Sequence, residues 1–151
     1  MSVMAAVLVG AAVSGCTVSA APRPQQQEDA PVNIGDVANA VVVVVPRVTE
    51  VTDPVRWKNG FGYGLELTIE TDTSEAFSVD DLDAVVKTVW AEIPWEPNTI
   101  TLFAGVEGTT EPVDLRVAAA GLADLNVTEA GQAGIGITGM SARYGTWLAP
   151  E

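Results

Sequence analysis

Residues 61–93 read FGYGLELTIETDTSEAFSVDDLDAVVKTVWAEI, and this stretch decides the fold class of the chain. From Phe61 to Thr71, apolar residues occupy every second position, and small or polar residues lie between them. A hydrophobic period of two predicts a strand with one core face and one wet face. The residues expected on the core face are Phe61, Tyr63, Leu65, Leu67 and Ile69.

The second half of the stretch predicts a helix that begins after Ser78 and ends at Pro94. Ser78 is a suitable N-cap, and Asp81 stands three residues on, as in a variant of the capping box. Acidic residues in the first turns suit the helix dipole. Apolar residues recur at spacings of three and four, which gives one buried face that includes Trp90. They are Val79, Leu82, Val85, Val86, Val89, Trp90 and Ile93.

Working outward, residues 99–106 alternate again and predict another strand. Residues 113–125 place Leu115, Ala118, Ala119 and Leu122 on one helical face of small residues. Val127 to Glu151 is rich in Gly and Thr. There we expect irregular structure, with a short strand at 135–137 and a turn of helix at 140–144.

Five consecutive valines, Val41 to Val45, precede these elements. Because β-branched residues favour strands, a continuous apolar run predicts a strand buried on both faces. Pro46 then marks an end or a bulge, and residues 47–52 continue the strand beyond it. Asp53-Pro54 and Asn59-Gly60 are predicted turns.

The predicted order is therefore β-β-α-β-α. The strand–helix–strand step from Leu65 to Leu102 should be a right-handed crossover between parallel strands. We expect an α+β fold, a two-layer sandwich in which a small mixed sheet carries helices on one face. The chain has 151 residues, which suits one domain.

The N-terminus carries an export signal in its sequence. Residues 3–13, VMAAVLVGAAV, are too short an apolar run to span a bilayer, but their length suits the apolar core of a signal peptide. The run ends at Val13-Ser14-Gly15-Cys16, and the chain then turns polar. A buried apolar helix, or an ordinary signal peptide with an incidental cysteine, are the alternative interpretations.

The sequence Val13-Ser14-Gly15-Cys16 resembles the lipobox of bacterial lipoproteins, and the composition resembles that of exported actinobacterial proteins. The resemblance implies that Cys16 is diacylated and becomes the new N-terminus after cleavage. It also implies an extracytoplasmic domain held at the cell membrane by its lipid. One departure is the absence of Lys and Arg before the apolar run. No characterised family is recognised in residues 37–151.

These features divide the chain into a signal peptide (1–15), a lipidated cysteine with a disordered tether (16–36) and one α+β domain (37–151). The tether is rich in Pro, Gln and Ala. About twenty flexible residues span about 25 Å, enough to hold a domain clear of lipid headgroups.

Charge and composition exclude several classes of function. Seven Lys+Arg against 20 Asp+Glu give a net charge of −13, which argues against nucleic-acid binding. It also argues against electrostatic adhesion of the chain to anionic lipid. The absence of His and the single Cys exclude a His-based triad and an internal disulfide, and leave no zinc site of the usual kind.

Three motifs are weak evidence for a cofactor or a metal. Residues 134–139 match G-x-G-x-x-G, but only twelve residues follow, too few for a dinucleotide-binding unit. Residues 80–83 lack the ligand spacing of an EF-hand and fit a helix N-terminus. The glycines at 60, 62 and 64 fit a strand in which they relieve crowding or mark a bulge. We therefore expect no cofactor and no metal.

The densest positive spot on the chain is Arg56-Trp57-Lys58. Trp57 is the best candidate for a surface residue that contacts a sugar or a partner protein. The alternative is a tryptophan that folds over the edge of the sheet.

Two hypotheses for the folded domain remain. In the first, the domain is a non-catalytic binding or accessory module that contacts an envelope protein or a cell-wall polymer through an exposed sheet face. In the second, it is a carboxylate-based hydrolase of envelope glycans, which would need two acids about 5–9.5 Å apart in a cleft. No residue is predicted to be catalytic.

Overall fold

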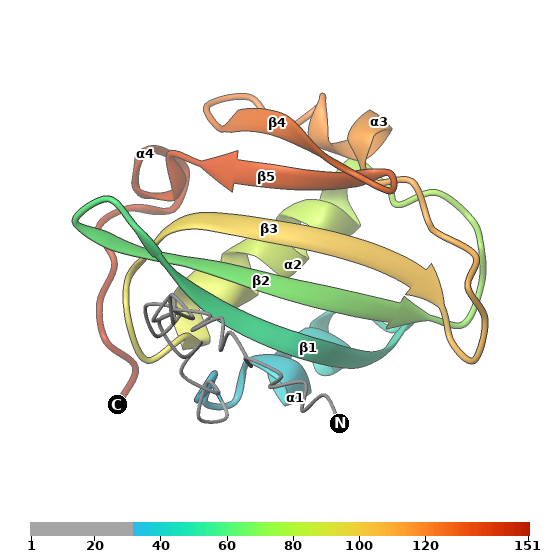
Figure 1. Cartoon of the computed structure of the whole chain (residues 1–151), viewed down its shortest axis with the longest axis horizontal. Helices are drawn as coiled ribbons and strands as arrows, with labels where there is room; N and C mark the ends of the chain where they lie inside the picture. The colour runs from blue at the N-terminus through green and yellow to red at the C-terminus, as the bar shows by residue number, and fades with distance from the viewer. Residues whose placement is uncertain (1–31) are drawn as a thin grey trace, which may run out of the picture.

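The computed structural model describes residues 32–151 and has an α+β fold with a five-stranded mixed sheet. The helices pack on one face of the sheet, as expected, and Figure 1 shows α2 lying behind the central strands. The elements are α1 (Val37–Val44), β1 (Val48–Asn59), β2 (Gly62–Thr71), α2 (Val79–Glu92), β3 (Pro97–Val106), α3 (Arg116–Ala119), β4 (Asn126–Gly131), β5 (Gly134–Thr138) and α4 (Met140–Tyr144).

The strands lie in the order β1-β2-β3-β5-β4. β1 and β2 form an antiparallel hairpin, and so do β4 and β5. β2 and β3 run parallel and are connected through α2, which confirms the predicted strand–helix–strand step. β3 pairs antiparallel with β5 and thereby joins the two halves of the sheet.

Two of the five residues predicted for the core face of β2 are exposed, Phe61 and, at 37%, Tyr63. Leu65, Leu67 and Ile69 are buried, as predicted. Phe61 is instead fully exposed, because it belongs to the two-residue loop at the hairpin tip. Gly60 takes the first loop position with φ +60°, the conformation that a tight hairpin loop of type II′ needs there.

The helix α2 begins and ends as predicted. The Ser78 hydroxyl accepts a hydrogen bond from the backbone N–H of Asp81 at 3.0 Å, which caps the helix. Trp90 is buried on the core side of this helix together with Leu82, Val85, Val86 and Val89. Val79, at the first turn, is partly exposed.

The prediction of a buried strand at Val41–Val45 is wrong. Val41 to Val44 form the end of α1 and Val45 is its C-cap residue; Val37, Val41 and Val45 are buried at intervals of four. A run of identical residues has no hydrophobic period, so its sequence does not distinguish a helix from a strand. Packing of the three buried valines against the core favours the helix here, and it outweighs the preference of valine for strands. Strand pairing starts only after Pro46, at Val48.

Two further predictions need correction. Asp53-Pro54 is not a turn but a bulge inside β1, where the pairing register shifts and Asp53 has φ +51°. The helix expected over residues 113–125 is reduced to the four residues of α3, and turns follow it. The four residues predicted for its packing face are nevertheless all buried: Leu115, Ala118, Ala119 and Leu122.

The C-terminal segment is more regular than expected. The short strand at 135–137 and the helix at 140–144 are confirmed as β5 and α4. β4 was not predicted, because its sequence NVTEAG has little hydrophobic alternation and forms the outer edge of the sheet.

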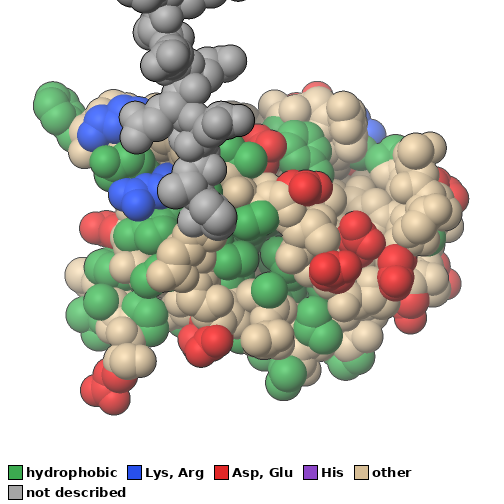
Figure 2. All heavy atoms as spheres, turned by 60° about the horizontal axis from the view of Figure 1, so that its bottom comes forward, with side chains coloured by type: hydrophobic (Ala, Val, Ile, Leu, Met, Phe, Trp, Pro, Cys, Tyr) green, Lys and Arg blue, Asp and Glu red, His purple; other side chains and the backbone are tan. Residues whose placement is uncertain are grey.

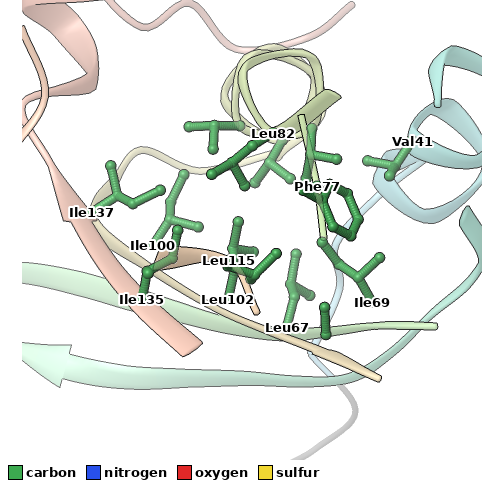
Figure 3. Close-up of a cluster of buried hydrophobic side chains, with 14 of the residues drawn as sticks. Val41, Leu67, Ile69, Phe77, Leu82, Ile100, Leu102, Leu115, Ile135 and Ile137 are labelled. Carbon is green, nitrogen blue, oxygen red and sulfur yellow. The ribbon is translucent and has the colours of Figure 1, made fainter. Parts of the chain in front are cut away.

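One core lies between the sheet and the helices. Figure 3 shows side chains from β2, β3 and β5 facing those from α2, α1 and the segment before α3. Ile69, Leu102 and Ile137 contribute from three neighbouring strands, and Leu82 and Val41 from two helices. Ile34 also packs against this core, so the folded part reaches back before α1.

Candidate functional site

The three residues of the predicted positive spot lie on β1 but do not point the same way. Arg56 pairs with Leu65 across the hairpin, and Lys58 pairs with Tyr63, so both side chains lie on the helix-bearing side of the sheet. Trp57 pairs with Gly64 and lies on the opposite, open face. The structure therefore separates the tryptophan from the two cations.

Arg56 and Lys58 form a basic–aromatic cluster with Tyr63 and Trp95. The Arg56 guanidinium carbon lies 3.7 Å from the Tyr63 ring centroid and 4.6 Å from that of Trp95. The Lys58 ammonium lies 4.7 Å from the Tyr63 centroid. Such cation–π contacts hold the charged groups in place. Within residues 32–151, neither cation lies within 4.0 Å of a carboxylate oxygen.

Trp95 was not predicted to belong to this cluster, since it comes from the loop between α2 and β3. Its ring meets that of Tyr63 edge-on, at 6.2 Å between centroids. Its indole N–H donates to the backbone carbonyl of Asn33 at 3.3 Å. The contact between Tyr63 and Lys58 could have been predicted, because a two-residue loop places them opposite each other. No sequence pattern indicates that Trp95 joins them.

Trp57 is half-buried and covers a glycine on the open face of the sheet. A Cβ atom on Gly64 would lie 2.2 Å from the Trp57 indole, so only glycine leaves room for the ring. Phe103 covers Gly134 in the same manner, at 2.5 Å from an added Cβ. The expectation that the strand glycines relieve crowding is met at Gly64.

A groove of about 780 Å³ runs between α1 and α2 on the outer side of the helix layer. Alanines line it on both helices, and Val43 and Val44 stand at its margin, 80% and 50% exposed. Four acidic residues and one lysine also line it: Asp36, Asp80, Asp83, Glu92 and Lys87. The groove thus combines an apolar lining with a negative rim.

A second hollow, of about 460 Å³, lies over the open sheet face near the β1 bulge. Three carboxylates line it, from Asp53, Glu66 and Glu111. Thr68 of β2 and Phe103 of β3 also contribute to its wall. The sequence analysis did not predict that these acids lie together, because they come from three separate segments.

Asp83 links α2 to α4. Its carboxylate accepts hydrogen bonds from Arg143 Nε and from the Tyr144 hydroxyl, both at 2.7 Å. Burial raises the pKa of Asp83, but the hydrogen bonds from these two partners and the charges of Arg143 and Lys87 outweigh it, so the pKa lies below its usual value. Burial and the bond to Asp83 raise the pKa of Tyr144. Both groups therefore keep one protonation state near neutral pH.

No group of three or more Asp, Glu or Cys side chains in the described part of the chain is arranged to hold a metal ion. The acidic residues at 80–83 occupy the first turns of α2, as the helix interpretation predicts. Residues 134–138 of the G-x-G-x-x-G match form β5.

The lipobox residues Val13, Ser14, Gly15 and Cys16 lie outside the described residues, and so does the predicted tether up to residue 31. Between residues 32 and 151, no helix is both long enough and apolar enough to cross a bilayer. Comparison of the chain with protein-family profiles, curated proteins and solved structures found no match.

Proposed function

We propose that this protein is a bacterial lipoprotein, anchored through Cys16 to the extracytoplasmic face of the cell membrane, whose folded domain is a non-catalytic binding module. The anchor rests on the sequence Val13-Ser14-Gly15-Cys16 behind an apolar leader. The binding role rests on one structural observation, the apolar groove with an acidic rim between α1 and α2. Its ligand is a segment of an envelope partner protein.

The exposed valines support a binding role for the groove. Val43 and Val44 belong to a run in which Val41 and Val45 are fully buried, yet they lie open at the groove margin. Exposed apolar side chains gathered beside a hollow are typical of interaction surfaces. The alanines between the two helices let the backbone of a partner helix approach closely, as in helix-in-groove recognition.

The charge of the rim selects the kind of partner. Asp36 and Glu92 lie where the start of α1 meets the end of α2, and Asp80 lies at the other end of the groove. A partner segment with apolar residues at helical spacing and flanking Lys or Arg complements this surface. The apolar lining favours such a segment over a cell-wall polymer, because sugars need many polar partners.

The anchor is tested by the mass of the mature N-terminus. We expect cleavage before Cys16 and added acyl mass, because two or more acyl chains give a stable membrane anchor. A Cys16→Ala variant should leave the detergent phase on phase partitioning. An unmodified Cys16 in the mature protein would refute the anchor.

The groove is tested with a photo-crosslinking residue placed at Val43, and at Val117 of α3 as the control. Val117 is similarly exposed, at 73%, and does not line the groove. We expect a discrete protein adduct from position 43 in membranes and none from position 117. Equal adducts from both positions would show that capture is unspecific.

A pair of charge variants tests whether the partner is basic. Ala91 lines the groove and is exposed. Ala91→Glu should strengthen the complex and Ala91→Lys should weaken it, each by about 0.5 kcal/mol, as for charges at a solvated rim. If both substitutions act in the same direction, charge complementarity is not what holds the partner.

A second candidate function is a carboxylate-based glycan hydrolase. One observation favours it, the hollow on the sheet face that Asp53, Glu66 and Glu111 line together. Two carboxylates in one cleft are what glycoside hydrolysis requires. Release of soluble sugar from isolated cell walls, lost in Glu66→Gln or Glu111→Gln and kept in Glu129→Gln, would support it. A wild-type protein that releases no sugar would exclude it.

A further inference from the structure

The β1–β2 hairpin tip carries a fully exposed phenylalanine next to the basic–aromatic cluster. Phe61 stands at the loop between the strands, three residues from Lys58 and two from Tyr63. Its side chain is neither part of the core nor packed against it. Apolar tips that stand beside Lys, Arg, Tyr and Trp are typical of protein surfaces that enter the interface of a bilayer.

The chain enters the folded domain at the same place. Trp95, which packs beside Arg56 and Tyr63, also holds the backbone carbonyl of Asn33 through its indole N–H. Fifteen residues lie between Cys16 and Val32, so the sixteen Cα-to-Cα steps span at most about 55 Å. An anchor at Cys16 therefore leaves this end of the domain within reach of the membrane.

We propose that the β1–β2 tip and the basic–aromatic cluster dock on the anionic lipid headgroups of the membrane that carries the anchor. Phe61 enters the interface, and Arg56 and Lys58 contact lipid phosphates. Tyr63 and Trp95 hold the two cations in position by cation–π contacts. This inference rests on the proposed lipid anchor, which brings the surface to the bilayer.

The net charge of −13 does not prevent this contact, because the charges are unevenly distributed. Salt screens charges that lie more than about 8 Å from the headgroups at physiological ionic strength. In Figure 2 most of the visible Lys and Arg side chains lie at the upper left beside apolar groups, with an acidic side chain next to them, and the largest group of acidic side chains lies on the right. The headgroups would therefore meet a surface that is less acidic than the other end of this face.

A fluorescent label on the tip tests the contact in the acylated protein. Acylated Cys16 has no free thiol and is the only cysteine, so a Phe61→Cys variant takes an environment-sensitive dye at one position. Val117→Cys, on the short helix α3, is the matched control. In vesicles of phosphatidylglycerol and phosphatidylcholine, we expect a blue shift at position 61 and none at position 117. Vesicles of phosphatidylcholine alone should give a smaller shift.

Two matched double variants separate local charge from total charge. Arg56→Gln with Lys58→Gln should lower the ratio of docked to free domain about thirtyfold on anionic vesicles, since each cation near the surface adds about 1 kcal/mol to the attraction. Lys87→Gln with Arg116→Gln removes the same total charge elsewhere and should leave the ratio unchanged. Circular dichroism of both proteins checks that they remain folded.

The outcomes distinguish this inference from the anchor. An acylated protein whose label at position 61 behaves like that at position 117 overturns the docking inference and leaves the anchor intact. Equal losses in the two double variants overturn it as well, because only total charge would then matter. An unmodified Cys16, found by mass, overturns the anchor, and the docking inference, which depends on it, falls with it.

Discussion

Arg143 Nε lies 2.7 Å from Asp83 Oδ1 and ties α4 to α2 across 60 residues of sequence. The same carboxylate oxygen accepts from the Tyr144 hydroxyl, and the Arg143 guanidinium also donates to the Ala123 carbonyl at 2.7 Å. One carboxylate therefore fixes the C-terminal helix on the helix layer. Each of these bonds has a charged donor or acceptor, and such bonds are stronger than neutral ones.

Asp83→Asn should lower the free energy of unfolding by about 1–2 kcal/mol at neutral pH, because the charged acceptor is lost. Urea denaturation measures this loss, provided that the dependence of the unfolding free energy on urea concentration is the same in both proteins. The control is Lys87→Gln, which also removes a charge from α2. Among residues 32–151, Lys87 makes no ion pair within 4.0 Å, so this substitution should have little effect on the free energy of unfolding.

The same bond makes the stability depend on pH. The pKa of Asp83 in the folded protein lies below its unfolded value of 3.8. A lowered pKa means that the stabilisation is fully present above pH 3.8 and is lost as the pH falls through the folded pKa. We therefore expect the difference in stability between wild type and Asp83→Asn to be constant from pH 5 to 7 and to shrink below about pH 4. A difference that grows on acidification would contradict this.

Two valine substitutions test whether residues 41–45 are helical in solution. Val41→Ala should cost about 2 kcal/mol, because a buried side chain is removed. Val43→Ala should leave stability unchanged or raise it by up to about 0.5 kcal/mol, because Val43 is exposed and alanine is the better helix former. Urea denaturation of the two variants gives the comparison. A strand buried on both faces would instead make both substitutions costly.

The close contact of Trp57 with Gly64 predicts a coupled pair. Gly64→Ala should destabilise the protein by about 1–3 kcal/mol, because its Cβ atom meets the indole at 2.2 Å. The cost should be smaller in a Trp57→Ala background, where the ring is absent. A double-mutant cycle by urea denaturation measures this. Additive effects would mean that the ring does not lie over the glycine.

Arg47 organises the loop before α2. Its guanidinium donates to the carbonyls of Thr73, Glu75 and Ala76, and it stacks on Phe77 with 4.6 Å from the guanidinium carbon to the ring centroid. Arg47→Lys keeps the charge but loses the fork of donors, and should cost about 1–2 kcal/mol. Arg116 is exposed, so Arg116→Lys should lower the free energy of unfolding by less in the same assay.

Local patterns were enough to predict the centre of the fold. The alternation through Leu65 to Ile69 and the helical spacing from Leu82 to Trp90 each imply one buried face, and these faces meet in the core. The cap at Ser78 was also predictable, because it depends on residues three apart. These elements carry their signal within a dozen residues.

The remaining features depend on contacts between distant segments. Val41 to Val44 are helical because Val37 and Val41, together with Val45 at the C-cap, pack into the core. The groove depends on how α1 lies against α2, and the basic–aromatic cluster depends on the loop that brings Trp95 to Arg56. No local pattern encodes such placements, so the sequence could propose Arg56, Lys58 and the Tyr63 contact across the hairpin, but not Trp95.

The bulge at Asp53-Pro54 has a consequence for assembly. β1 is a border strand, and an unbroken border of free N–H and C=O groups is a template for a strand from a second copy. Proline offers no N–H, and the bulge interrupts the regular spacing halfway along β1. The border is therefore a poor template along its full length for pairing with a second copy of the domain.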